Sequence, residues 1–225
     1  MIAAENLIKK FNDDHHEVYP VNGVSFTIKD GSFFGIIGRS GSGKTTLLKM
    51  LGGLLVPTNG NVVINGEDIY SLNECRLAEF RSRNIGFVFQ DYFLEEMYTV
   101  YQNIEIVLMI AGVKQNKRKE MIEASLEAVH LAEKKDVLVK HLSGGEKQRV
   151  SIARAIVNGQ QIIFADEPCG NLDYENSRNV MELFRRQCDS GKTVVLITHS
   201  FEDAGLTDEI IKLMDGKIIE HEIYR

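Results

Sequence analysis

The residues best suited to chemistry form a glycine-rich stretch between positions 38 and 45. Its sequence, Gly-Arg-Ser-Gly-Ser-Gly-Lys-Thr, fits the P-loop spacing G-x-x-x-x-G-K-[ST]. Glycines let successive backbone N–H groups converge on phosphate oxygens, and the positive end of a following helix adds to that field. We expect Lys44 to reach the β- and γ-phosphates of a nucleotide and the Thr45 hydroxyl to ligate Mg²⁺. A flexible glycine turn without a ligand is the alternative, and the four fixed positions match by chance in about 1% of chains of this length.

Two carboxylates, Asp166 and Glu167, directly follow the apolar run 162–165. An open α/β sheet keeps its ligand crevice at the carboxyl ends of its strands. We predict that Asp166 is the direct or indirect partner of the Mg²⁺ and that Glu167 faces a water aligned on the γ-phosphate. An isolated pair of strand-end acids is often merely solvated, but the nearby glycine loop favours the catalytic interpretation.

A second glycine motif, Leu-Ser-Gly-Gly at positions 142–145, precedes an apolar helical pattern. Ser143 is a suitable N-cap, and the two glycines allow an anion to approach the N-terminus of this helix. A simple helix cap is the other interpretation. One phosphate group does not need two such cradles from one chain, so the second motif indicates a site completed by another subunit.

The elements that must position these motifs follow from the hydrophobic pattern. The runs 24–28 and 33–37 predict a β-hairpin, and the glycine loop then leads into a helix over 44–55. The other predicted elements are a strand over 61–66, a strand over 85–89 within a mostly helical stretch from 72 to 158, strands over 161–165 and 193–197 with a helix over 174–190 between them, and a closing hairpin at 209–214 and 217–222. The core is therefore expected to be α/β with buried parallel strands.

Composition limits the classes of protein that remain. The chain has 225 residues, of which 44% are hydrophobic and 26% charged, values that exclude a disordered or fibrous protein. Its charge, 26 − 32 = −6, argues against a nucleic-acid partner. Three cysteines without CxxC spacing, and a start without a leader pattern, favour a reducing cytoplasm. The longest apolar run, 106–113, is far shorter than the roughly 18 residues of a membrane-spanning helix.

The chain resembles the ATP-binding-cassette (ABC) ATPases along nearly its whole length. Residues 142–145 match the family signature Leu-Ser-Gly-Gly, and Glu146 follows where the family more often has Gln. Gln90 matches the Q-loop, Gly-Asn-Leu-Asp at 170–173 the D-loop, and His199 the switch histidine. The sequences at 87–90 and 164–173 look most like the branch serving macrolide export, lipoprotein release and antimicrobial-peptide resistance.

The resemblance implies an α/β P-loop NTPase fold. This fold has a mostly parallel RecA-like sheet, an N-terminal antiparallel β subdomain and an inserted α-helical subdomain. Residues 1–225 would form a single ABC ATPase domain. About 1–90 and 159–225 would form the catalytic core with the β subdomain, and about 91–158 the helical subdomain.

The resemblance also assigns roles to particular residues. The catalytic residues would be Glu167, His199, Gln90 and Lys44, and the residues serving the metal would be Thr45, Gln90 and Asp166. ATP would be held by Phe11, Gly38, Arg39, Ser40, Gly41, Ser42, Gly43, Lys44, Thr45 and Thr46, and by Ser143, Gly144, Gly145 and Asp173 across the dimer interface. Phe11 stands where an adenine-stacking tyrosine is usual, with Tyr19 as the second candidate. Cys169, where relatives usually carry threonine, is assigned to packing; a thiol exposed beside the nucleotide is the alternative. His15 and His16 are assigned to a solvated loop.

The implied function is hydrolysis of ATP with Mg²⁺ by a head-to-tail homodimer that drives an integral membrane permease. Such a subunit lies at the cytoplasmic face of the cell membrane and contacts the membrane only through the permease. The permease surface is expected in the helical insertion and in the segment 91–103, whose large apolar side chains would otherwise be core.

Two other classes of protein compete with this interpretation. Soluble ABC ATPases of DNA repair usually carry long coiled-coil insertions and those of translation usually carry two cassettes, and the chain has neither feature. In a P-loop kinase or GTPase, the motif at 143–145 and His199 would have no role. The transported substrate is not encoded in this subunit, because the membrane subunit selects it in this family.

Overall fold

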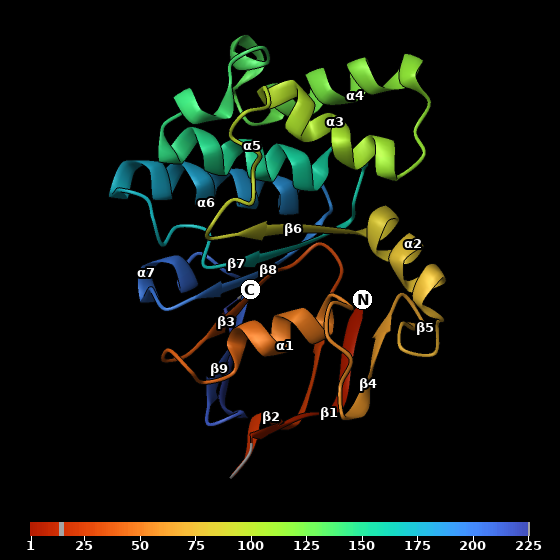
Figure 1. Cartoon of the computed structure of the whole chain (residues 1–225). Coiled ribbons are helices and arrows are strands. Elements are labelled where there is room, and N and C mark those ends of the chain that lie inside the picture. The colour runs from red at the N-terminus through yellow and green to blue at the C-terminus, as the bar shows by residue number, and fades with distance from the viewer. Residues whose placement is uncertain (14–15, 225) are drawn as a thin grey trace.

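The computed structural model describes residues 1–13 and 16–224, which form two β-sheets with helices around them (Figure 1). His16 begins a strand, and His15 lies outside the described residues. The smaller sheet is antiparallel and has the strand order β2-β1-β4-β5. Its strands are β1 (Ile2–Asp13), β2 (His16–Ile28), β4 (Asn59–Ile64) and β5 (Glu67–Asp68).

The larger sheet has six strands in the order β10-β9-β3-β8-β7-β6. They are β3 (Phe33–Ile37), β6 (Ile85–Phe89), β7 (Ile162–Asp166), β8 (Thr193–Thr198), β9 (Glu209–Met214) and β10 (Lys217–Ile223). All neighbouring pairs are parallel except β9 and β10, which form the expected closing hairpin. Every residue of β3 and β8 is buried, as expected for central strands covered on both faces.

The predicted hairpin between 24–28 and 33–37 is wrong. Residues 24–28 belong to β2, which pairs with β1, whereas β3 pairs in parallel with β8 and β9 in the other sheet. The turn at Asp30 and Gly31 thus carries the chain from one sheet to the other. The reason is burial: the run 33–37 is apolar throughout, so it is stable only where both its faces are covered.

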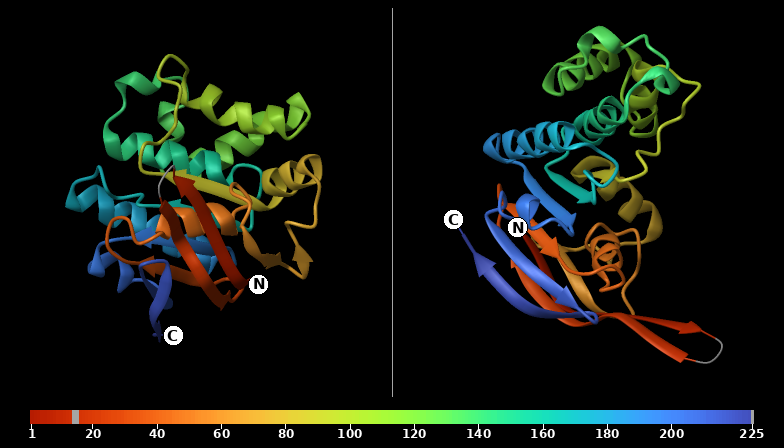
Figure 2. Two further views of the ribbon diagram at one scale, coloured as in Figure 1. Left: turned by 60° about the horizontal axis from the view of Figure 1, so that its bottom comes forward. Right: turned by 90° about the vertical axis from the view of Figure 1, so that its left-hand side faces the viewer.

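Helices cover both faces of the large sheet (Figures 1 and 2). On one face, α1 (Lys44–Leu51) packs its leucines with Phe34 and Phe164. On the other face, α5 (Gly144–Ile156) and α6 (Tyr174–Asp189) pack with Phe33 and Ile163. The remaining helices are α2 (Glu74–Asn84), α3 (Val100–Ile110), α4 (Gln115–Ala128), α7 (Phe201–Ala204) and two short 3-10 turns (Ala132–Lys134 and Val139–His141).

The predicted helical stretch between 72 and 158 and its single strand, β6, are confirmed. The helix expected over 44–55 is shorter and ends at Leu51, because Gly52 caps it and Gly53 takes a left-handed φ of 68°. Among the described residues, no helix has both the length and the apolar composition needed to cross a bilayer.

Candidate active site

The glycine loop joins the end of β3 to the start of α1 and closes around its own lysine. Lys44 is 5% exposed, and its Nζ donates hydrogen bonds to the carbonyl oxygens of Gly38 (2.9 Å) and Arg39 (3.0 Å). Gly43 has a φ of 101°, and a Cβ there would lie 1.8 Å from the Pro20 carbonyl oxygen, so only glycine fits. At Gly41 a Cβ would meet nothing within 4 Å. The loop therefore wraps around the lysine ammonium and has open space at Gly41, an arrangement that fits a phosphate cradle.

Asp166 ends β7 beside the start of α1. Its Oδ1 accepts a hydrogen bond from Thr45 Oγ1 at 3.2 Å. Burial raises the pKa of Asp166, and the hydrogen bond from Thr45 partly offsets this rise. In the described residues, no group of three or more His, Cys, Asp or Glu side chains could hold a metal ion. The two neighbouring oxygens nevertheless suit Mg²⁺, which proteins commonly bind through one or two carboxylates together with substrate phosphates and water.

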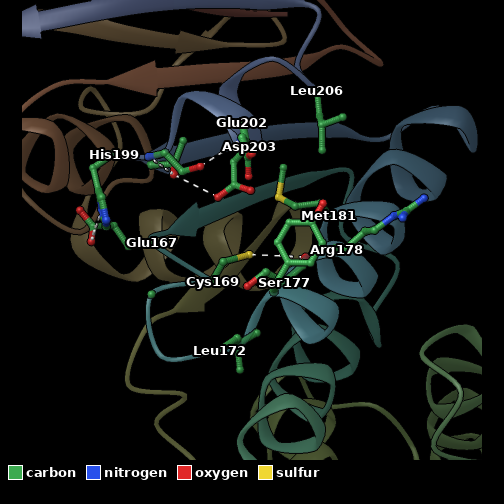
Figure 3. A pocket seen from close by; sticks show the side chains of 14 residues that line it. Glu167, Cys169, Leu172, Ser177, Arg178, Met181, His199, Glu202, Asp203 and Leu206 are labelled. Carbon is green, nitrogen blue, oxygen red and sulfur yellow. Dashed lines mark hydrogen bonds and ion pairs between the residues drawn. The ribbon is translucent and has the colours of Figure 1, made fainter.

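Glu167 lies between the lysine of the loop and the histidine that follows β8. Its Oε1 is 3.9 Å from Lys44 Nζ, and its Oε2 is 3.3 Å from His199 Nδ1 (Figure 3). Glu167 has a left-handed φ of 47°, which its N–H stabilises by donating to the Ile197 carbonyl at 3.0 Å. The structure thus gathers Lys44, Thr45, Asp166, Glu167 and His199 at the carboxyl ends of three parallel strands.

Gln90 joins this group through the register of the sheet. Phe89 at the end of β6 lies opposite Asp166 at the end of β7, so the next residues, Gln90 and Glu167, leave adjacent strands at the same edge. The side chain of Gln90 contacts Asn171 of the loop after β7.

A cavity of about 400 Å³ adjoins Glu167 and His199 (Figure 3). Cys169 lines it, and its Sγ donates to the Ser177 carbonyl at 3.7 Å. Burial raises the pKa of the Cys169 thiol to about 12. The thiol is therefore protonated at neutral pH and packed against α6, which supports the packing role over that of a reactive thiol.

The second glycine motif opens α5, on the opposite face of the large sheet from α1 (Figure 1). Ser143 is the predicted N-cap: its Oγ accepts from the Glu146 N–H at 3.3 Å. The Glu146 carboxylate accepts from the Ser143 N–H at 2.9 Å and pairs with Lys134. This capping box escaped the sequence analysis, although its Ser-x-x-Glu spacing was visible. Lys134 balances the charge that distinguishes Glu146 from the more usual glutamine.

For three further predicted residues, the side-chain partners described below are not members of the Lys44–Glu167 cluster. Asp173 caps α6, where both its oxygens accept from Asn176 at 2.8 Å, and these hydrogen bonds lower its pKa. Phe11 is 45% exposed near the end of β1, with Lys9 Nζ 5.2 Å from its ring centroid. Tyr19, the second candidate, donates its hydroxyl to Glu17 at 2.8 Å. The side-chain partners named here all lie within three residues along the chain.

The parallel sheet, the strand–glycine loop–helix unit and the acidic strand end define a P-loop nucleoside triphosphatase. A family model described as ABC transporter matches residues 21–170, and the chain belongs to this family.

The similar proteins include combined ATP-binding/permease proteins and separate ATP-binding proteins. The macrolide export ATP-binding/permease protein MacB of Brucella melitensis is 42% identical over 97% of this chain, which spans 34% of that relative's length. The lipoprotein-releasing system ATP-binding protein LolD of Aquifex aeolicus is 39% identical over 97% of this chain and 96% of its own length.

Among solved structures, the chain is similar to the ATP-binding cassette MJ0796, determined as a dimer in a post-hydrolysis state with ADP and Pi. The TM-score is 0.92 at 34% identity, covering 100% of this chain and 99% of the other. The predicted ABC fold is thereby confirmed.

Proposed function

We propose that this chain is the ATP-binding subunit of a membrane complex, and that it hydrolyses ATP with Mg²⁺ as a head-to-tail dimer to drive an integral membrane permease. The names of its relatives support this proposal, since MacB is an export ATP-binding/permease protein and LolD belongs to a lipoprotein-releasing system. The similar cassette that was solved as a dimer with ADP and Pi supports the dimer and the nucleotide.

The observation that carries the proposal is the separation of two glycine-bearing helix N-termini. The first opens α1 and is surrounded by Lys44, Asp166, Glu167 and His199. The second opens α5 on the other face of the sheet, and its described hydrogen bonds are local ones. Helix N-termini attract phosphate, so a second copy turned head to tail would bring its α5 loop to the γ-phosphate at the first copy's α1.

Within one site, we assign the following work to this chain's residues. Bound ATP with Mg²⁺ supplies the phosphoryl group and a divalent charge that stabilises it. Lys44 and the N–H groups of the loop hold the phosphates, and the Thr45 and Asp166 oxygens hold the metal. Glu167 accepts the proton of the attacking water at a carboxylate oxygen, while His199 keeps that carboxylate in place.

The remaining predicted residues complete the proposed site. Gln90 offers its amide oxygen to the metal or the water, and the exposed ring of Phe11 stacks on adenine. The other ATP-binding residues of the first copy are Arg39, Ser40, Gly41, Ser42 and Thr46, and the second copy adds Ser143, Gly144, Gly145 and Asp173.

The permease surface is proposed for the segment after β6. Phe93 is 64% exposed and Met97 63% exposed, and Tyr98 is also exposed. Large apolar side chains that are exposed together on one short segment are typical of an interaction site. We place this surface in the helical subdomain, about 91–158, which is inserted in the catalytic core with the β subdomain, about 1–90 and 159–225. The subunit would then sit at the cytoplasmic face of the membrane, held there by the permease.

ATP-dependent dimer formation tests the proposal directly. Analytical ultracentrifugation of Glu167→Gln should give a dimer with ATP and a monomer with ADP, because only the triphosphate reaches both cradles. Glu202→Gln, which changes another carboxyl beside the same cavity, serves as the matched control and should keep the hydrolysis of the unaltered protein. A Glu167→Gln protein that stays monomeric in saturating ATP would contradict the head-to-tail site.

A further inference from the structure

The loop after β7 contacts Gln90 through two hydrogen bonds, both made by Asn171. Asn171 Nδ2 donates to the backbone carbonyl oxygen of Gln90 at 3.2 Å. In return, Gln90 Nε2 donates to Asn171 Oδ1 at 3.3 Å. A Cβ at Gly170 would lie 2.9 Å from Gln90 Nε2, so the glycine before Asn171 makes room for this side chain.

These two bonds fix the orientation of both side-chain amides. A backbone carbonyl can only accept, so Asn171 must turn its nitrogen toward the Gln90 carbonyl. The Asn171 side-chain oxygen then faces Gln90, so Gln90 must donate a hydrogen bond from its side-chain nitrogen. The Gln90 Oε1 is left without a donor among the described residues. Oxygen is the atom that a magnesium ion takes as a ligand.

The same loop is tied to Glu167. The Gly170 N–H donates to the Glu167 carbonyl at 3.0 Å, and the Leu172 N–H donates to the Cys169 carbonyl at 3.0 Å. Asp173 then caps α6. Asn171 is therefore held in a turn that starts on the proposed general base and ends on a helix, which gives it a fixed position from which to orient Gln90.

The far end of the Gln90 segment is anchored separately. Tyr92 and Phe93 have left-handed φ values of 58° and 48°, conformations that persist only where contacts hold them. Arg154 of α5 supplies the contacts, since its guanidinium donates to the Tyr92 carbonyl at 2.7 Å and also to the Phe93 carbonyl. With that end fixed by Arg154, the contact that sets the Gln90 side chain itself is the one with Asn171.

We infer that Asn171 is a positioning residue that orients the Gln90 amide, with its nitrogen bound to the loop after β7 and its oxygen free for the metal of the nucleotide complex. This inference rests on the proposed function, because it gives Gln90 its role toward the metal. Asn171 itself touches neither metal nor nucleotide in this account.

A double-mutant cycle read by metal binding tests the inference. The probe is Mn²⁺, titrated by electron paramagnetic resonance into the full chain saturated with a non-hydrolysable ATP analogue. Asn171→Ala and the bulkier Asn171→Leu both remove the two hydrogen bonds, and Leu does so without opening space. Each should weaken Mn²⁺ binding roughly three- to tenfold, as expected for losing an exposed orienting hydrogen bond. Asn116→Ala, an exposed asparagine on α4, is the matched control and should have no effect.

The second arm of the cycle separates orientation from structure. In the Gln90→Ala background, Asn171→Ala should cause no further loss of Mn²⁺ affinity, because the group it orients is gone. An equal loss in both backgrounds, no loss in either, or unchanged Mn²⁺ binding in Gln90→Ala alone would overturn the inference. If Glu167→Gln still loses turnover in those cases, the proposed function stands without this role for Asn171.

Discussion

The two glycine-bearing loops of this chain differ in what surrounds them. The loop before α1 lies at the carboxyl ends of parallel strands, where Thr45 bonds to Asp166 and Lys44 lies 3.9 Å from Glu167. The loop before α5 lies on the opposite face of the sheet, and the Ser143 hydroxyl and N–H form hydrogen bonds within its own helix. One loop thus has the proposed catalytic residues around it, and the other has only the N-terminus of its helix.

This difference indicates how the work is divided between two copies. In the proposed site, the first loop binds the phosphates and Glu167 beside it activates a water. The second can add positive potential at a helix N-terminus, which is useful only where a phosphate is brought to it. Changes at the first loop should therefore affect one chain's own binding and chemistry, and changes at the second should affect only the closed dimer.

The largest effect is expected from Glu167→Gln. Removing the proposed base should lower the rate of phosphate release by roughly 10²–10⁴ and leave ATP binding intact, because the amide keeps the shape but cannot accept the proton. Steady-state phosphate release and equilibrium binding of ATP measure the two quantities. Unchanged turnover would remove Glu167 from this role.

Lys44→Ala should act on binding. Loss of the ammonium that lies over the loop should weaken ATP affinity by roughly 10²-fold, as expected when a charge-assisted contact to phosphate is lost. Isothermal titration of the monomeric protein measures it, with the exposed Lys29→Ala as control. Normal affinity in Lys44→Ala would argue against the cradle.

Ser143→Ala tests the role of the loop before α5. It should lower turnover about tenfold while the ATP affinity of the monomer stays unchanged, because this loop acts only across the dimer. The change also removes a helix cap, which costs about 1 kcal/mol of stability. Thr99→Ala removes the similar capping box of α3 and controls for that loss. Equal turnover in the two variants would place Ser143 outside the site.

The smallest effect is expected from Phe11→Ala. Loss of one aromatic face should weaken ATP affinity roughly three- to tenfold, and Phe11→Tyr should keep it. Fluorescence titration with a labelled ATP analogue measures both. If Tyr19→Ala weakens binding and Phe11→Ala does not, the stacking role passes to Tyr19.

Much of the fold was predictable because its elements have simple periodicity. The buried strands β7 and β8 and the helix α6 between them were found within a residue or two of their bounds. The pairing of β3 was not predictable, because a short apolar strand does not show in its sequence which strand it pairs with. The sequence favours the neighbouring run 24–28, whereas β3 pairs with β8 and β9. Strand partners are fixed by burial across the whole sheet.

The candidate site was predictable where a motif fixes chemistry and spacing together, as for Lys44 and Glu167. Asn171 and Arg154 were missed for a different reason. Their contacts with Gln90, Tyr92 and Phe93 join positions 61 to 81 residues apart along the chain. No sequence spacing predicts such a hydrogen bond for an exposed asparagine or a helical arginine. These contacts become visible only once the loops are placed side by side.

The central claim is that one ATP is held by two copies of this chain. A crystal structure of Glu167→Gln with ATP or a non-cleavable analogue measures this directly. We predict a closed dimer in which the γ-phosphate contacts Lys44 of one copy together with Ser143 and the Gly145 N–H of the other. A closed dimer in which each triphosphate touches a single copy would contradict it.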